Sequence, residues 1–246
     1  MTVVKVLCGG LLFGDAFHII PFFNKIMHEH RPSKIIWIAG SFVRDVPEFL
    51  THFYPLEVVI KDDISVPVDI NARVQFQQRY QDEFNKIEAD LAFDDLNITW
   101  ERGFYYPKES LFLMNADKLE GEAEDSIVVH PYTRNTWKQV RAMTQVDWSQ
   151  FNRTVYSVGM SNEFLVPNSI DLRGAAFFDV AKRIVNARIS VCIHSAVACL
   201  AMYLRKPTIV CHPWALPPTF SDFSDRMYDL ISPMPEDIVG AVTSKL

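Results

Sequence analysis

A single acidic residue, Asp15, lies between two apolar runs in the stretch GLLFGDAFHIIPFF at residues 11–24. Gly14 precedes it, and His18 follows about one helical turn later. Where a strand turns into a helix, a carboxylate can cap the helix and stabilise it by roughly 1 kcal/mol. It can also act as a general base that takes the proton from an acceptor hydroxyl. The residues alone leave both roles of Asp15 open; in the second role, Gly14 and His18 would lie beside the base, on the side of the acceptor.

A polar turn after an apolar strand, HPYTRNTWK at residues 130–138, carries the groups that suit a diphosphate. It offers hydroxyls, two cations and backbone N–H groups at the start of a helix, where the helix dipole favours an anion. We therefore expect Thr133, Arg134 and Lys138 to bind a diphosphate, such as that of a donor substrate. An ordinary N-cap with its charges in solvent explains the same pattern.

A second turn of this kind occurs in ISVCIHSAVACLAMYLRKP at residues 189–207, where His194 and Ser195 end a strand and Ala196 opens a helix of small residues. Small residues let a phosphate approach the N–H groups of the first helical turn. We expect these three residues and Gly159, in the strand-end sequence VGMSNE, to bind the donor. Ser195 as a plain N-cap and His194 bonded to a neighbouring carbonyl are the alternatives.

Motifs of several other enzyme classes are missing from the sequence. GxSxG, the P-loop, HExxH and GxGxxG do not occur, and neither does the spaced DxD pair that holds a metal-bound diphosphate. We therefore expect no metal and no cofactor besides the donor substrate. Cations and N–H groups would then balance the charge of the leaving group.

Apolar runs alternate with helical patterns along both halves of the chain, which predicts parallel sheets flanked by helices. The expected strands are residues 3–9, 34–40, 56–62, 126–132, 154–160, 189–195 and 207–213. The expected helices are residues 15–30, 43–53, 70–91, 136–145, 175–187, 196–204 and 235–246.

An acidic segment without apolar periodicity, ADKLEGEAEDS at residues 116–126, predicts a linker. The fold class is then α/β, with two Rossmann-like βαβ domains, residues 1–122 and 123–246, facing an interdomain cleft. The first is expected to hold the acceptor, beside Asp15, and the second a donor that carries a diphosphate. The last helix, from residue 235, is expected in the second domain or packed back on the first.

Composition narrows the class of protein further. The 246 residues are 49% hydrophobic and carry a net charge of −6, so nucleic acid is a possible partner but not a favoured one. The four cysteines form no CxxC pair and predict buried, reduced thiols. No signal peptide and no membrane span are apparent in the sequence, and a cytoplasmic protein is expected.

Several of these stretches together resemble one family. Residues 14–40, GDAFHIIPFFNKIMHEHRPSKIIWIAG, are similar to the N-terminal signature of the ADP-heptose:lipopolysaccharide heptosyltransferases, and HPYTRNTWK is similar to that family's H-x-x-T-R turn. Residues 189–210 follow the family's strand, D-[ST]-G turn and L-x-K-P-x-[IV] strand, with His194, Ala196 and Cys199 in place of aspartate, glycine and histidine. The resemblance implies a glycosyltransferase B (GT-B) fold, a metal-free reaction, a nucleotide sugar bound by the C-terminal domain and Asp15 as the base.

The function that these observations favour is a metal-independent glycosyltransferase, which moves a sugar from a nucleotide sugar to a hydroxyl of a glycan or another acceptor. A nucleotide-sugar-binding protein without transferase activity is one alternative. A phage-type DNA glycosyltransferase that acts on a modified base is another, with Arg73, Arg79 and Lys86 on the helix expected at 70–91 as phosphate contacts.

Overall fold

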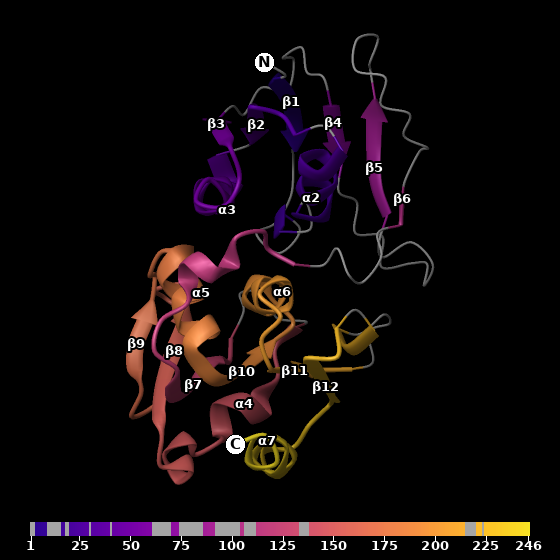
Figure 1. The fold of residues 1–246 in the computed structure, drawn as a ribbon. Coiled ribbons are helices and arrows are strands. Elements are labelled where there is room, and N and C mark those ends of the chain that lie inside the picture. Colours follow the sequence, from indigo (N-terminus) through magenta and orange to yellow (C-terminus); the bar gives the residue numbers. More distant parts are fainter. Residues whose placement is uncertain are drawn as a thin grey trace. The chain divides into compact units, whose positions relative to one another are not determined.

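The chain divides into two compact units, residues 1–115 and 116–246. The computed structural model describes residues 3–8, 16–17, 20–29, 31–39, 41–60, 70–73, 86–91, 104–105, 112–132, 138–214, 220–222 and 224–246. Each unit is built on one six-stranded sheet (Figure 1). Parallel strands with helical connections make up most of both sheets, so the expected α/β class is confirmed.

The first unit has the strand order β3-β2-β1-β4-β5-β6. Its parallel strands are β1 (Val3–Cys8), β2 (Lys34–Ala39), β3 (Leu56–Ile60) and β4 (Ile70–Arg73). Two antiparallel strands, β5 (Lys86–Leu91) and β6 (Phe104–Tyr105), complete it. Its helices are α2 (Ile20–Glu29) and α3 (Asp45–Leu50), and Ala16 and Phe17 are helical as well.

The prediction of one long helix at residues 70–91 is wrong, because both ends of this segment are strands. β4 pairs with β1 on one side and with β5, antiparallel, on the other. In the sequence of β5, apolar and charged residues alternate with the two-residue period typical of a strand. Arg73 ends β4 and Lys86 begins β5, so no single helix presents these cations together, and the observation that favoured a DNA acceptor is lost.

The core of the first unit forms between α2 and the sheet. The ring of Phe23 packs at 5.3 Å from Trp37 and at 5.4 Å from Tyr54, measured between ring centroids. Asn24, also buried in α2, accepts a hydrogen bond from the Tyr54 hydroxyl at 2.7 Å and donates one to the carbonyl of Phe112 at 2.7 Å. These contacts fix the helix that begins just after the GDAFH sequence.

The second unit is a fully parallel sheet of order β12-β11-β10-β7-β8-β9. Its strands are β7 (Glu124–His130), β8 (Thr154–Gly159), β9 (Ile170–Arg173), β10 (Ala187–Ile193), β11 (Thr208–His212) and β12 (Met227–Ile231). Counted in chain order this is 3-2-1-4-5-6, the order of dinucleotide-binding α/β domains. The sequence analysis missed β9 and β12, which are short edge strands of four and five residues.

Helices cover both faces of this sheet (Figure 1). One face packs against α4 (Arg141–Gln145) and α7 (Pro235–Thr243), and the other against α5 (Phe177–Asn186) and α6 (Ala196–Tyr203). Ile238 and Val242 of α7 are fully buried in the core of this unit. The last helix therefore packs within the second unit.

The acidic segment expected as a linker is part of the second unit. Residues Ala116–Leu119 form a 3₁₀ turn, and β7 already begins at Glu124. The backbone N–H of Gly121 donates to Oδ1 of Asn186 at 2.8 Å, and Glu124 forms an ion pair with Arg183 of α5. Hydrogen bonds and an ion pair thus hold this acidic stretch against a helix.

The three cysteines whose side chains are described, Cys192, Cys199 and Cys211, are buried free thiols, as expected. Burial raises the pKa of Cys192 well above its ordinary value and that of Cys211 to about 12, so both stay protonated and unreactive near neutral pH. None of the helices in the described part of the chain has the length and apolar character needed to cross a bilayer.

Candidate functional site

The candidate site lies at the carboxyl ends of β7 and β10 in the second unit. These two strands are neighbours, with His130 paired opposite Cys192, and the strand order reverses between them. Open α/β sheets bind their ligands at such a switch point, because the connections diverge there to opposite faces of the sheet. His130 ends β7, and Ser195 directly precedes α6, which follows β10.

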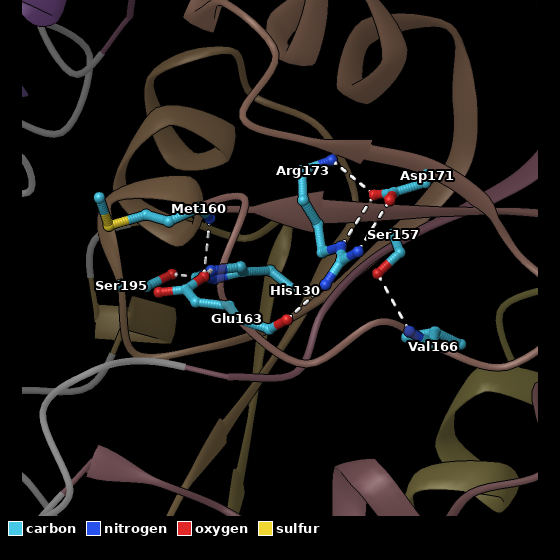
Figure 2. Close-up of polar contacts among 8 residues, drawn as sticks. All are labelled: His130, Ser157, Met160, Glu163, Val166, Asp171, Arg173 and Ser195. Carbon is cyan, nitrogen blue, oxygen red and sulfur yellow. Dashed lines mark hydrogen bonds and ion pairs between the residues drawn. The ribbon is translucent and has the colours of Figure 1, made fainter.

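Three side chains form a chain of hydrogen bonds at this point (Figure 2). Nδ1 of His130 lies 2.8 Å from Oγ of Ser195, and Nε2 of His130 lies 3.2 Å from Oε2 of Glu163. The side chains of His130 and Glu163 are only 7% and 6% exposed, whereas Ser195 is half-buried. A buried carboxylate thus holds an imidazole whose other nitrogen contacts a more accessible hydroxyl.

The turn after β8 holds Glu163 in place. Oε2 of Glu163 also accepts the backbone N–H of Met160 at 2.9 Å. The guanidinium of Arg173, on β9, donates to the backbone carbonyl of Glu163 at 2.5 Å. Two further hydrogen bonds of 2.8 Å join Arg173 to the carboxylate of Asp171, and they lower the pKa of Asp171 to about 2 (Figure 2). The position of the Glu163 carboxylate is therefore set by two neighbouring strands.

Gly159 makes room for this arrangement at the end of β8. Its φ is +140°, and a Cβ added there would lie 2.4 Å from Oε2 of Glu163 and 3.1 Å from Cδ2 of His130. A side chain would collide with the carboxylate and the imidazole. Glycine is thus required at this position, because of both the backbone conformation and the close approach.

Ser195 occupies the N-cap position of α6, but its hydroxyl makes no capping hydrogen bond. Its backbone carbonyl accepts the N–H of Cys199 at 3.1 Å, while Oγ turns to His130. The alternative of a plain N-cap is therefore wrong for this serine. The start of α6 at Ala196 agrees with the sequence analysis.

His194 belongs to an aromatic cluster beside β11. Its ring lies 5.5 Å from His212 and 5.0 Å from Phe220, both edge to face. Nε2 of the fully buried His212 lies 2.5 Å from Oδ1 of Asp229. The backbone N–H of Phe220 also donates to Oδ1, and that of Ser221 donates to Oδ2. Burial alone would raise the pKa of Asp229, but hydrogen bonds from His212 and Ser221 hold it below its ordinary value.

The structure brings together only some of the site residues predicted from the sequence. Gly159 and Ser195 meet at His130 and Glu163. Lys138 is half-buried and lies three residues before the start of α4. The predictions for Asp15, Gly14, His18, Thr133 and Arg134 lie outside the described residues.

Sequence reasoning assigned no role to His130 and Glu163. Both lie inside strand-end stretches that the sequence analysis selected, HPYTRNTWK and VGMSNE. A histidine in one stretch and a glutamate in another give no sign in the sequence that their side chains touch. Among the residues that the structure describes, no three His, Cys, Asp or Glu side chains are grouped as a metal site.

The second unit thus combines the strand order of dinucleotide-binding α/β domains with polar side chains at its switch point. By sequence, no family model and no curated protein matches the chain. Solved structures match over nearly its whole length. E. coli heptosyltransferase WaaC with ADP has a TM-score of 0.63 at 10% identity and covers 98% of this chain and 100% of its own.

Two further structures agree with this likeness. E. coli ADP-heptose LPS heptosyltransferase II has a TM-score of 0.63 at 10% identity, with 98% of each chain covered. The glycosyl transferase family 9 protein of Veillonella parvula has a TM-score of 0.58 at 10% identity, with 99% of this chain and 90% of its own covered. This chain therefore has the fold of the heptosyltransferases, which confirms at the level of fold the resemblance seen in its sequence.

Proposed function

We propose that this protein is a glycosyltransferase that binds a nucleotide sugar at the switch point of its second unit and transfers the sugar to an acceptor hydroxyl. The observation that carries the proposal is Ser195, held by His130 and Glu163 at the N-terminus of α6, in a chain with the heptosyltransferase fold. Solved relatives of this fold include WaaC with ADP and WaaC with ADP-2-deoxy-2-fluoro heptose, which supports a nucleoside diphosphate sugar as the donor.

In the proposed reaction the acceptor oxygen forms a bond to the anomeric carbon as the bond from that carbon to the diphosphate breaks. The acceptor proton passes to the carboxylate of Asp15. Thr133, Arg134 and Lys138, together with Ser195 and the first turn of α6, bind the departing diphosphate. His194, Ala196 and Gly159 shape this donor pocket, and Gly14 and His18 lie on the acceptor side.

The proposal includes a reaction without metal, because the sequence has no DxD pair and offers cations and N–H groups for the diphosphate instead. The acceptor is a hydroxyl of a glycan or a similar molecule, since the helix that favoured DNA does not form. The interdomain cleft, the absence of other cofactors and the cytoplasmic location stay predictions.

A nucleotide-sugar-binding protein without turnover is the second candidate, favoured by His194 and Ala196 where the similar family has aspartate and glycine. The test is to incubate the protein with a panel of nucleotide sugars and glycan acceptors in chelator, and to measure donor binding and turnover of the donor separately. Binding with turnover that Asp15→Asn abolishes supports the transferase. Binding without turnover supports the second candidate, and no binding of any nucleotide sugar overturns both.

A further inference from the structure

The hydrogen bonds of Glu163 determine which nitrogen of His130 carries a proton. An ionised carboxylate only accepts hydrogen bonds, and Oε2 of Glu163 already accepts the N–H of Met160. Nε2 of His130 must therefore donate to the same oxygen. In a neutral imidazole the other nitrogen, Nδ1, is then an acceptor.

Ser195 consequently has to donate its only proton to Nδ1 of His130 while the imidazole is neutral. Its hydroxyl then presents lone pairs to the site, and lone pairs repel phosphate oxygens. To bind a phosphate as a donor, Ser195 must recover its proton. It can do so when His130 is protonated, because both ring nitrogens then donate and Oγ accepts from Nδ1.

We infer that a nucleoside diphosphate binding at this switch point draws a proton from solvent onto His130, so that Ser195 turns its hydroxyl proton to the phosphate. This inference rests on the proposed donor site. His130 is a positioning residue in it, since it acts on the ligand through Ser195. Glu163 is the counterion of protonated His130, and the bound diphosphate adds further negative charge near this cation.

The surroundings of His130 suit a change of charge at this position. Glu163, from the turn after β8, provides a buried negative charge against Nε2. On the neighbouring strand β10, Cys192 faces the backbone of His130 and remains a neutral thiol. From β9, the cation of Arg173 is bonded to the backbone carbonyl of Glu163 and to Asp171. A carboxylate in contact with the ring offsets much of the cost of charging a buried imidazole.

Proton uptake can be measured by titrating the full-length protein with ADP, and separately with UDP, in a calorimeter. Buffers of different ionisation enthalpy give the number of protons bound, between about pH 6 and about pH 9. The terminal phosphate of the ligand itself titrates at about pH 6. The informative quantity is therefore the difference in proton uptake between wild type and variant. Wild type is expected to take up protons, with an affinity that falls by up to about tenfold per pH unit on the alkaline side.

His130→Asn is the matched variant, because its amide nitrogen can donate to Ser195 permanently without titrating. It is expected to bind ADP with less proton uptake and without the alkaline loss of affinity. His28→Asn, on the exposed end of α2, is the control for removing a histidine and should behave as wild type. Ser195→Ala should bind more weakly and also lose the proton uptake.

The protonation state of His130 can also be measured on wild type alone, which tests the inference even if a variant does not fold. Nitrogen-15 spectra distinguish the neutral imidazole with a proton on Nε2 from imidazolium, and His130 is expected to change from the first to the second when ADP is added. Equal proton uptake in wild type and His130→Asn, or a neutral His130 in the complex, overturns the inference and leaves the donor site intact. No binding of ADP, UDP or any nucleotide sugar overturns the proposed function and the inference with it.

Discussion

The hydroxyl of Ser195 lies 2.8 Å from Nδ1 of His130, although Ser195 stands where a serine ordinarily caps its own helix. The two residues are 65 positions apart in the chain and meet because β7 and β10 are neighbours in the sheet. A side chain that could have stabilised α6 is thus directed to the ligand-binding edge of the sheet.

Asp15→Asn is expected to reduce sugar transfer by about 100-fold or more, because the amide cannot take the proton of the acceptor. Binding of the nucleotide sugar should change little, since Asp15 is assigned to the acceptor. Initial transfer rates and calorimetric titration with the donor measure the two effects separately. Transfer at the wild-type rate would remove Asp15 from the role of base.

Gly159→Ala is expected to lower the free energy of unfolding by about 2 kcal/mol and to weaken ADP binding, because the new methyl group would displace Glu163 and His130. Gly240→Ala is the matched control. Gly240 lies in α7, and apart from its chain neighbours and the backbone of its own helix no atom lies within 4 Å of an added Cβ, so this change should stabilise by roughly 0.5–1 kcal/mol. Chemical denaturation measures both; equal effects at the two positions would contradict the crowding described at Gly159.

Asp229→Asn is expected to destabilise the protein at neutral pH, because Asp229 accepts hydrogen bonds from His212 and from the backbone of Ser221. The pKa of Asp229 is lower in the folded protein than its ordinary value of 3.8, so its ionised form favours folding above that value. This contribution is lost as the pH falls through the lowered pKa.

The free energy of unfolding of wild type and Asp229→Asn should therefore converge as the pH falls below about 4. Urea denaturation at a series of pH values measures this. Asp225→Asn, at an exposed position in the turn before β12, is the control and should cost little at any pH. A difference for Asp229→Asn that stays constant down to acid pH would contradict the assignment.

Tyr54→Phe is expected to cost about 1–3 kcal/mol of stability in the first unit, because it removes the buried hydrogen bond that the Tyr54 hydroxyl donates to Oδ1 of Asn24. Burial raises the pKa of Tyr54 far above its ordinary value, so its hydroxyl should not titrate before the unit unfolds in alkali. Thermal unfolding and the ultraviolet absorbance of tyrosinate measure these effects. Tyr228→Phe, on the partly exposed strand β12, should have a smaller effect.

The amino-acid sequence alone determined the α/β class, most of the parallel strands and the strand ends at which a ligand would bind. Strands buried on both faces are short continuous apolar runs, whereas amphipathic helices repeat about every 3.6 residues, and both patterns can be read within a short window. The stretch at 14–40 and the two later turns were also sufficient to identify the heptosyltransferase fold, which the solved structures then supported at only about 10% identity.

Only the tertiary structure decided that residues 70–73 and 86–91 are paired strands, because a strand partner far along the chain can override a local helical pattern. It also decided that Ser195 contacts His130 and that Glu163 holds His130 in turn. These residues come from three separate strand ends, and the parallel sheet brings them together across 33 and 65 positions of sequence. Local periodicity carries no information on such distant contacts, since they depend on strand order, and the order of strands is a property of the folded chain.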